Sequence, residues 1–233
     1  TRLSRGLGDV YKRQAEDLIT LATQTAEAGT DGFMVGGSTD LSLENVDLAV
    51  ETIKETTHMP VILFPTHASS VSGKADAIFF MSLLNSESRQ FLVGEQIASA
   101  PWVKKTGLEP LSMAYLVVAP GMTAGRVGQA QPLPRDQPDL VVSHALAGQY
   151  LGMKYIYLEA GSGASEPVPE NIIKAVRESI DVTLIVGGGI RTPESARKVV
   201  AAGADIVVTG TFVETSQSLK EEMTVLTNAI HSK

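Results

Sequence analysis

Two glycine clusters in the second half of the chain have the composition and the surroundings of a phosphate-binding site. They lie in IVGGGIRTPE (185–194) and VVTGTFVE (207–214), and each follows an apolar run typical of a buried strand. Backbone N–H groups in such loops, together with a helix N-terminus, bind phosphate oxygens, and glycine leaves no Cβ in their way. The candidate residues are Gly188, Gly189, Gly210 and Thr211. The alternative is that these glycines only make tight turns.

A third motif, YLEAGSGA (157–164), ends another predicted strand and contains one acidic side chain, Glu159. A solvated surface charge is not expected at the end of a buried strand, so Glu159 is a candidate functional acid. The alternative is a structural carboxylate that accepts hydrogen bonds from loop N–H groups. The following residues, Gly161, Ser162 and Gly163, are expected to form a further cradle for an anion or a hydroxyl group.

The elements that position these motifs alternate between strands and helices. Strands are predicted at residues 32–37, 60–64, 75–84, 112–120, 153–161, 182–190 and 204–211. Helices are predicted at residues 15–29, 41–57, 88–105, 138–152, 168–180, 192–203 and 212–233, with an irregular stretch at 121–137. The strands are nearly continuous apolar runs, which indicates a parallel sheet buried on both faces. One further strand at the N-terminus would complete a (β/α)₈ barrel.

The link between two of these strands departs from a regular barrel. Between the strands at 60–64 and 75–84 there are only about ten residues, which is too short for a crossover helix. We therefore predict an α/β fold, a modified (β/α)₈ TIM barrel in which a loop replaces one outer helix.

The first fourteen residues differ in character from the rest of the chain. Residues 1–14, TRLSRGLGDVYKRQ, carry four basic side chains and one acid and show neither a helical nor a strand period. They are too polar for a signal peptide. We interpret them as a non-native or mistranslated leader, the alternative being an ordinary basic arm. Because they stand where the first barrel strand would be, that strand is doubtful, and residues 15–233 are expected to form a single TIM-barrel catalytic domain.

Composition excludes several classes of protein and of site. Of the 233 residues, 43% are apolar and 19% charged, which excludes a disordered, collagen-like or coiled-coil chain. The net charge of −7 has the wrong sign for a non-specific nucleic-acid binder. The chain has no cysteine, and its four histidines are scattered without an HExxH motif, so a metal site built from Cys or His is not expected.

Four motifs, in this order and spacing, resemble the geranylgeranylglyceryl phosphate synthase family, which includes the bacterial heptaprenylglyceryl phosphate synthases. They are VGGSTDLS (35–42), PGMTAGRVGQA (120–130), YLEAGSGA (157–164) and VGGGIRTPESA (186–196). The resemblance covers Ala15 to about Glu214 and implies a modified (β/α)₈ barrel that lacks one outer helix. It also implies a prenyltransferase that joins sn-glycerol 1-phosphate to a polyprenyl diphosphate, here geranylgeranyl diphosphate, and forms the ether bond of archaeal membrane lipids with Mg²⁺ as cofactor.

The resemblance assigns a role to each matching residue. Glycerol phosphate would be held by Tyr157, Leu158, Glu159, Ala160, Gly161, Ser162 and Gly163, and its phosphate by Gly188, Gly189, Gly210 and Thr211. Glu159 would accept a hydrogen bond from the attacking hydroxyl group and act as its general base. Ser38 would lie at the Mg²⁺ ion that neutralises the prenyl diphosphate.

The chain departs from the family pattern at two places. Relatives have Gly-Asn where this chain has Gly210 and Thr211, a mild change because backbone N–H groups do most of the phosphate binding. Relatives also begin with a strand whose Asp binds Mg²⁺, whereas here Asp9 lacks the surrounding motif. Two alternatives therefore stay open: a glycerol-phosphate-binding barrel without metal catalysis, and another phosphate-binding TIM-barrel enzyme.

The resemblance also implies surroundings and partners for this site. The candidates for an apolar prenyl groove, each of which could instead belong to the core, are 79–84, Phe91, Trp102, Met113, Tyr115 and Met122. Arg126 would contact the diphosphate or be solvated. We expect a cytoplasmic homo-oligomer, a dimer or a hexamer, with peripheral membrane contact through the prenyl chain and no nucleic-acid partner.

Overall fold

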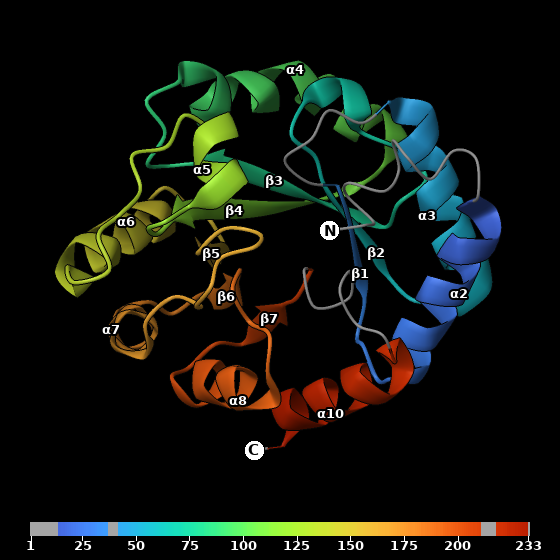
Figure 1. Cartoon of the computed structure of the whole chain (residues 1–233). Helices are drawn as coiled ribbons and strands as arrows, with labels where there is room; N and C mark the ends of the chain where they lie inside the picture. Colours follow the sequence, from blue (N-terminus) through green and yellow to red (C-terminus); the bar gives the residue numbers. More distant parts are fainter. Residues whose placement is uncertain (1–13, 37–41, 211–217, 233) are drawn as a thin grey trace. The chain divides into compact units, whose positions relative to one another are not determined.

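The computed structural model describes residues 14–36, 42–210 and 218–232, in which strands and helices alternate along the chain (Figure 1). The strands are β1 (Phe33–Gly36), β2 (Val61–Phe64), β3 (Ala77–Leu83), β4 (Glu109–Val117), β5 (Tyr155–Glu159), β6 (Thr183–Gly187) and β7 (Ile206–Val208). The helices are α2 (Gln14–Glu27), α3 (Leu43–Thr57), α4 (Glu95–Thr106), α5 (Met122–Val127), α6 (Pro138–Tyr150), α7 (Glu170–Ser179), α8 (Pro193–Ala201) and α10 (Leu219–His231).

The strands of the described chain form a seven-stranded sheet in which their order is the order of the chain, from β1 to β7. The register of the central strands is parallel and in step, since Leu158 of β5 lies opposite Leu116 of β4 and Val186 of β6. Successive strands in chain order with helices between them are the topology of a (β/α) barrel. The predicted fold class is therefore confirmed. The doubtful first strand falls in residues 1–13, outside the described residues.

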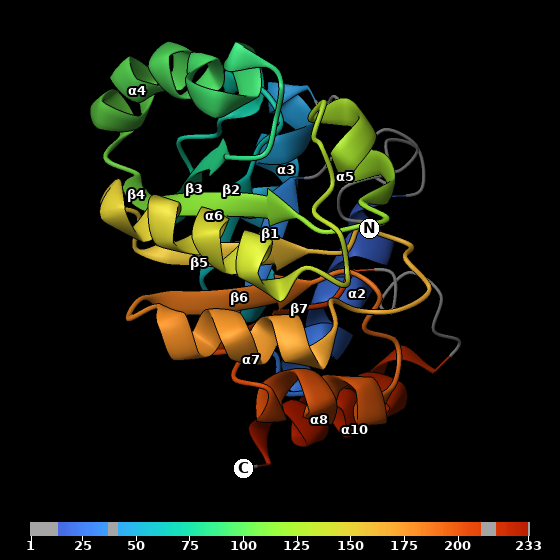
Figure 2. The same cartoon turned by 90° about the vertical axis from the view of Figure 1, so that its left-hand side faces the viewer.

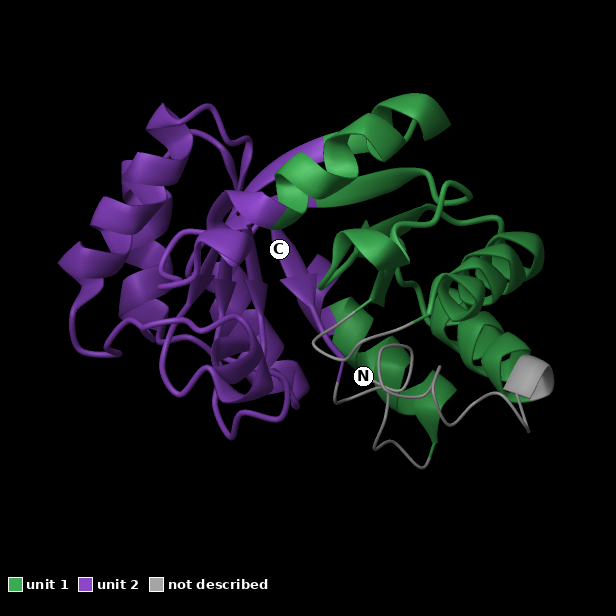
Figure 3. Ribbon diagram, turned by 90° about the horizontal axis from the view of Figure 1, so that it is seen from above, with its two compact units in different colours: residues 1–79, 95–110, 213–228 green, residues 80–94, 111–212, 229–233 purple. Residues whose placement is uncertain are grey.

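The chain divides into two compact units, shown in different colours in Figure 3. Unit 1 comprises residues 1–79, 95–110 and 213–228, and unit 2 comprises residues 80–94, 111–212 and 229–233. Strand β3 begins in unit 1 and continues into unit 2. The expectation of one domain over residues 15–233 stays a prediction.

In unit 1 the link between β2 and β3 has no α-helix, as its length predicted. This described segment contains only a 3₁₀ turn, Ala68–Ser70. The side chain of Glu95 supports the turn, because its Oε2 accepts a hydrogen bond from the Ala68 N–H at 2.7 Å and its Oε1 lies 3.0 Å from Nδ1 of His67. One carboxylate thus supplies acceptors that a helix would have provided from its own backbone.

Unit 1 also joins an early part of the chain to a late one. Helix α10 contacts the end of α2, where Lys220 Nζ lies 2.7 Å from Glu27 Oε2. The Thr227 hydroxyl, which is buried, donates a hydrogen bond to the carbonyl oxygen of Ala28. These contacts link positions almost two hundred residues apart in sequence.

In unit 2 the strands β4, β5 and β6 supply a core of fully buried aliphatic side chains, including Leu116, Ile156, Leu158, Leu184 and Ile185. Helices α6 and α7 lie side by side in Figure 2, and they are in contact. Helix α8 begins at a capping box formed by Thr192 and Ser195, with Pro193 in its first turn. The cap fixes where the glycine-rich loop after β6 ends and the helix begins.

The structure corrects the sequence prediction at two places in the helices. The stretch at 121–137, expected to be irregular, contains the short helix α5. Its two glycines, Gly121 at the N-cap and Gly125 within it, hide the helical pattern because glycine has a low helix propensity. The helix predicted at 88–105 begins as a π-helical turn, Gln90–Gly94, before α4.

Among the helices of the described residues, none combines the length and the apolar character that a membrane-spanning helix needs.

Candidate active site

Glu159 is the last residue of β5 and its side chain is buried, with 7% of its surface exposed. The Gly161 N–H donates a hydrogen bond to Oε1 at 2.6 Å, and the Tyr115 hydroxyl donates one to Oε2 at 3.1 Å. The Tyr157 hydroxyl also hydrogen-bonds to this carboxyl group. Burial raises the pKa of Glu159, and the three hydrogen bonds only partly offset that effect. The site therefore contains a carboxylate that binds a proton more readily than a solvated one does.

Two tyrosines place their hydroxyl groups on Glu159. Tyr115 and Tyr157 lie opposite each other in the register of β4 and β5, and their rings meet edge to face with centroids 5.1 Å apart. Tyr157 and Glu159 share one face of β5 because side chains alternate along a strand. Burial, followed by the charge of Glu159, raises the pKa of both tyrosines well above the usual value. Both hydroxyl groups thus stay protonated and act as hydrogen-bond donors.

Glycines at the end of β6 leave room for these side chains. A Cβ at Gly187 would collide with the Tyr157 hydroxyl, and a Cβ at Gly188 would lie 2.5 Å from Oε1 of Glu159. Gly188 also has φ of +82°, a conformation that favours glycine. These glycines therefore make room for the side chains of Tyr157 and Glu159, in addition to any room that they leave for a ligand.

The loop after β5 is held between the loops that follow β4 and β6. The Ala160 N–H donates a hydrogen bond to the Gly187 carbonyl at 3.0 Å, and the Ala160 carbonyl accepts one from the Gly121 N–H at 3.1 Å. A Cβ at Gly161 would lie 2.7 Å from the Gly121 carbonyl, and a Cβ at Gly189 would collide with the main chain of Glu166. The three strand ends are therefore packed main chain against main chain.

The structure thus brings together most of the residues predicted to bind glycerol phosphate. Those at the ends of β5 and β6, in contact or in adjacent loops, are Tyr157, Glu159, Ala160, Gly161, Ser162, Gly163, Gly188 and Gly189. The side chain of Leu158 is fully buried on the other face of β5, so only its main chain remains a candidate. Gly210 follows β7, which pairs with β6. Thr211 and Ser38 lie outside the described residues.

The described residues lack the set of ligands that a divalent metal needs. Mg²⁺ prefers carboxylate and other oxygen ligands in octahedral geometry. The described part of the chain contains no group of three His, Cys, Asp or Glu side chains that could hold a metal ion. Each carboxylate oxygen of Glu159 already accepts a hydrogen bond. The described residues therefore do not make up a magnesium site by themselves.

The candidates for the prenyl groove fall into two groups. Phe79, Met113 and Tyr115 are buried, and Tyr115 is a partner of Glu159. Met122, which is 44% exposed, lies on α5 against Gly161. Trp102, which is 40% exposed, lies on α4, where its Nε1 donates a hydrogen bond to the Val71 carbonyl. The roles of these residues in a prenyl groove stay predictions. The role of Arg126, which is exposed on α5, also stays a prediction.

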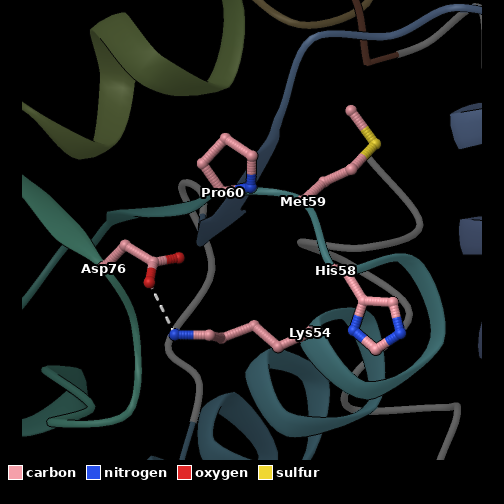
Figure 4. Close-up of a pocket in the computed structure, with 5 residues that line it drawn as sticks. All are labelled: Lys54, His58, Met59, Pro60 and Asp76. Atoms are coloured by element: carbon pink, nitrogen blue, oxygen red, sulfur yellow. Dashed lines mark hydrogen bonds and ion pairs between the residues drawn. The ribbon is translucent and has the colours of Figure 1, made fainter.

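A separate cavity of about 430 Å³ lies in unit 1 at the amino ends of β2 and β3 (Figure 4). Its lining residues are Lys54, His58, Met59, Pro60 and Asp76. Lys54 Nζ lies 2.6 Å from Oδ1 of Asp76 across this cavity, and none of the predicted site residues lines it. Glu159 and the glycine clusters lie at the carboxyl ends of their strands, which is the position of active sites in (β/α) barrels.

Sequence reasoning missed two features of this site. Tyr115, which its sequence position makes a candidate for the prenyl groove, donates a hydrogen bond to Glu159. Gly187 is the second, because a Cβ there would collide with the Tyr157 hydroxyl. The alternation of Tyr157 and Glu159 along one strand was the available signal that an aromatic hydroxyl would lie near the carboxylate.

Comparisons with known proteins show which proteins this chain is similar to. The sequence profile described as the PcrB family matches residues 9–229. The chain is 55% identical over 201 residues to a geranylgeranylglyceryl phosphate synthase from Pyrococcus horikoshii, covering 86% of this chain and 79% of the relative. It is 48% identical over 224 residues to the synthase from Methanothrix thermoacetophila, covering 96% and 88% of the two chains.

Solved structures are similar over the same range. The (S)-3-O-geranylgeranylglyceryl phosphate synthase from Thermoplasma acidophilum, in complex with sn-glycerol-1-phosphate, has a TM-score of 0.89 and 46% identity and covers 92% of this chain and 87% of its own. Orotidine 5'-phosphate decarboxylase from Pyrococcus horikoshii, at 16% identity and a TM-score of 0.62 over 97% of each chain, shows likeness of fold alone.

Proposed function

Because the chain belongs to the PcrB family, we propose that it is a prenyltransferase that joins sn-glycerol 1-phosphate to geranylgeranyl diphosphate. The product would be 3-O-geranylgeranyl-sn-glyceryl 1-phosphate, which carries the ether bond of archaeal membrane lipids. The observation that supports this proposal best is the buried Glu159, which is the last residue of the parallel strand β5 and adjoins glycine-rich loops on both sides. A relative of the same fold binds sn-glycerol-1-phosphate, which fits a site of this composition.

Glu159 is proposed to orient the nucleophile and to accept its proton. The glycerol hydroxyl oxygen forms a bond to the first carbon of the prenyl chain while the bond from that carbon to the diphosphate breaks. Diphosphate leaves with the electron pair, and the hydroxyl proton passes to the Glu159 carboxylate. The carboxylate can still accept it, because its two oxygens together have about four acceptor positions and the described hydrogen bonds use three. Its raised pKa makes it a stronger base than a solvated carboxylate.

Tyr115 and Tyr157 are proposed to keep this carboxylate in one orientation. Their hydroxyl groups approach it from β4 and from β5, and both are buried. Donors that are held in place before the reaction need no reorganisation when the proton moves. A nucleophile positioned in this way reacts at a much higher effective concentration.

The phosphate of the glycerol substrate is proposed to bind at the loops after β6 and β7. Gly188 and Gly189 both have positive φ and precede the capped N-terminus of α8. Main-chain N–H groups near a helix N-terminus favour an anion. Gly210 and Thr211 would supply the second wall, and the loop Gly161–Gly163 would contact the glycerol.

Mg²⁺ is proposed as cofactor, with Ser38 beside it. When bound, this ion would act as a Lewis acid that neutralises charge on the departing diphosphate. We also propose that the protein is a cytoplasmic homo-oligomer, a dimer or a hexamer, which touches the membrane surface through its prenyl substrate. These proposals rest on the family resemblance.

A product assay tests the proposed function. The chain would be incubated with sn-glycerol 1-phosphate, Mg²⁺ and either the C20 or the C35 prenyl diphosphate, and the products identified by mass spectrometry. We expect the C20 ether. The C35 ether alone would change the proposed prenyl substrate, and binding of glycerol phosphate without either product would indicate a binding protein instead of a transferase.

A further inference from the structure

The loop after β5, residues 160–168, is tied on one side by Arg135. Its Nη1 donates a hydrogen bond to the Ala119 carbonyl at 3.2 Å, and its Nη2 donates one to the Pro167 carbonyl at 2.9 Å. The same Nη2 lies 3.4 Å from Oε2 of Glu166. One planar guanidinium group therefore joins the end of β4 to the far end of the loop.

Arg191 ties the middle of the same loop from the β6 side. Its Nη2 donates a hydrogen bond to the Gly163 carbonyl at 2.8 Å. The N–H of that same peptide unit, which belongs to Ala164, donates a hydrogen bond to the Gly161 carbonyl at 3.0 Å. Both polar groups of one peptide plane are thus fixed. The main chain of Arg191 is itself anchored, because its N–H donates to the Ser195 hydroxyl at the start of α8.

This loop needs such support because of its composition. Gly161 and Gly163 have φ of +103° and +86°, and a Cβ at Gly163 would meet nothing within 4 Å. Glycine loses more conformational freedom on ordering than any other residue. Ala160, Ala164 and Val168 are buried, but Ser162 and Glu166 are exposed and the two glycines have no side chain, so burial offsets only part of that loss. Charge-assisted hydrogen bonds to its carbonyl groups are the compensating interactions.

We propose that Arg135 and Arg191 are positioning residues that hold the loop 160–168 in its ligand-binding shape before sn-glycerol 1-phosphate arrives. This inference rests on the proposed function, since it names how that site gains its affinity for glycerol phosphate. Neither arginine hydrogen-bonds to Glu159, so the proton acceptor stays in place when either is replaced. A loop ordered in advance lowers the entropy loss on binding. The arginines therefore act on substrate affinity and not on the bond-making step.

The test uses Arg135→Gln, Arg191→Gln and the conservative variants Arg135→Lys and Arg191→Lys in the full chain. Arg197→Gln is the matched control, because Arg197 is an exposed arginine on α8 near Arg191 in sequence. Calorimetry gives the Kd for sn-glycerol 1-phosphate, and steady-state kinetics give kcat and the KM for each substrate. Hydrogen–deuterium exchange of the peptide containing residues 160–168 reports the order of the loop without ligand.

We expect each glutamine variant to weaken binding of sn-glycerol 1-phosphate roughly tenfold, with kcat and the KM for prenyl diphosphate changed less than about twofold. Exchange in the loop should become faster without ligand. Arg191→Lys should recover most of the affinity, because one ammonium group can reach one carbonyl. Arg135→Lys should recover less, because an ammonium group replaces a planar fork that joins two carbonyls.

Three results would overturn the proposal. One is unchanged affinity in both glutamine variants. Another is weaker binding with unchanged loop exchange, which would mean that the arginines contact the substrate directly. The third is a fall in kcat with an unchanged KM for glycerol phosphate. If the unaltered chain neither binds nor converts glycerol phosphate, the proposed function fails, while the exchange measurement still shows whether the arginines order the loop.

Discussion

Asp76 and Glu159 are both carboxylates at the end of a strand, but their surroundings differ. Asp76 lies at the amino end of β3, where Oδ2 accepts a hydrogen bond from the Val61 N–H at 2.8 Å and Oδ1 lies 2.6 Å from Lys54 Nζ. Burial alone would raise the pKa of Asp76, but Lys54 and the Val61 N–H outweigh it and lower the pKa. Glu159, at the carboxyl end of β5, has two tyrosine hydroxyls and one amide as partners, and burial raises its pKa.

The arrangement around Asp76 in unit 1 occurs a second time in unit 2. Asp205 precedes β7, and its Oδ2 accepts a hydrogen bond from the Leu184 N–H at 2.8 Å and lies 2.7 Å from Arg177 Nη1. In both cases the aspartate N–H donates back to the same neighbouring strand residue, at 3.0 Å for Asp76 and 2.9 Å for Asp205. In both cases the cation comes from the helix before that strand. A paired carboxylate that caps a strand stabilises the fold, whereas an unneutralised one is suited to accept a proton.

The largest effect that separates the two kinds of carboxylate is on catalysis. We expect Glu159→Gln to lower kcat by about 10²–10⁴-fold, because the amide cannot accept the proton of the nucleophile. The amide has the shape of the carboxyl group, so the fold should be kept. Steady-state kinetics measure the effect, and Glu170→Gln, at an exposed residue of α7, is the control. Turnover like that of the unaltered chain would remove Glu159 from the mechanism.

A smaller effect on catalysis is expected when a tyrosine hydroxyl that donates a hydrogen bond to Glu159 is removed. Tyr115→Phe removes one hydroxyl donor and should lower kcat about tenfold, because the carboxylate loses part of its fixed orientation. The aromatic packing against Tyr157 is kept. Single-turnover kinetics with both substrates bound would separate this step from binding. A rise in KM with unchanged kcat would assign Tyr115 to the binding of substrate.

For Asp76 the effect should be on stability alone. We expect Asp76→Asn to lower the free energy of unfolding by about 1 kcal/mol at neutral pH, with kcat unchanged. The pKa of Asp76 is lowered from 3.8 in the unfolded chain, so its ionised form stabilises the fold at pH values above 3.8. This stabilisation is lost as pH falls through the pKa of the folded chain. The difference between variant and unaltered chain should therefore shrink in acid. Urea unfolding at several pH values measures it, with the exposed Asp136→Asn as control.

The smallest effect has the opposite sign and concerns the stability of Glu159→Gln. The pKa of Glu159 in the folded chain is raised above the unfolded value of 4.5. The unaltered chain therefore loses stability as pH rises from 4.5 through the pKa of the folded chain. The glutamine variant has no such loss. It should be the more stable of the two at neutral pH, and this difference should shrink as pH falls below that pH range. A variant less stable at neutral pH would show that the ionised carboxylate holds the loop together.

The sequence predicted the strands well because most of them are short, buried apolar runs, as in YIYLE of β5 and TLIVG of β6. It predicted the missing outer helix because a link of that length cannot contain one. Helix α5 was missed because Gly121 and Gly125 conceal its pattern. The misses thus fall where backbone conformation is decided by tertiary contacts and not by local composition.

The candidate site was only partly predictable, for a similar reason. Glu159 and Gly188 stand in recognisable motifs, but the register that brings Tyr115 to Glu159 is a property of paired strands. The glycines were expected to admit a phosphate, yet the structure shows that a Cβ at Gly189 would first collide with the main chain of Glu166. Arg135 donates to main-chain carbonyls, which have no sequence pattern.

The contacts between α2 and α10 have a consequence for the order in which the chain can fold. The hydrogen bond from Thr227 to Ala28 and the ion pair between Lys220 and Glu27 cannot form until the ribosome has made the last described helix. Most of unit 2, residues 111–212, is complete before then. Distant contacts also form slowly, because the intervening chain must first lose entropy. During synthesis, unit 2 should therefore form its native contacts first, before α10 can contact the end of α2.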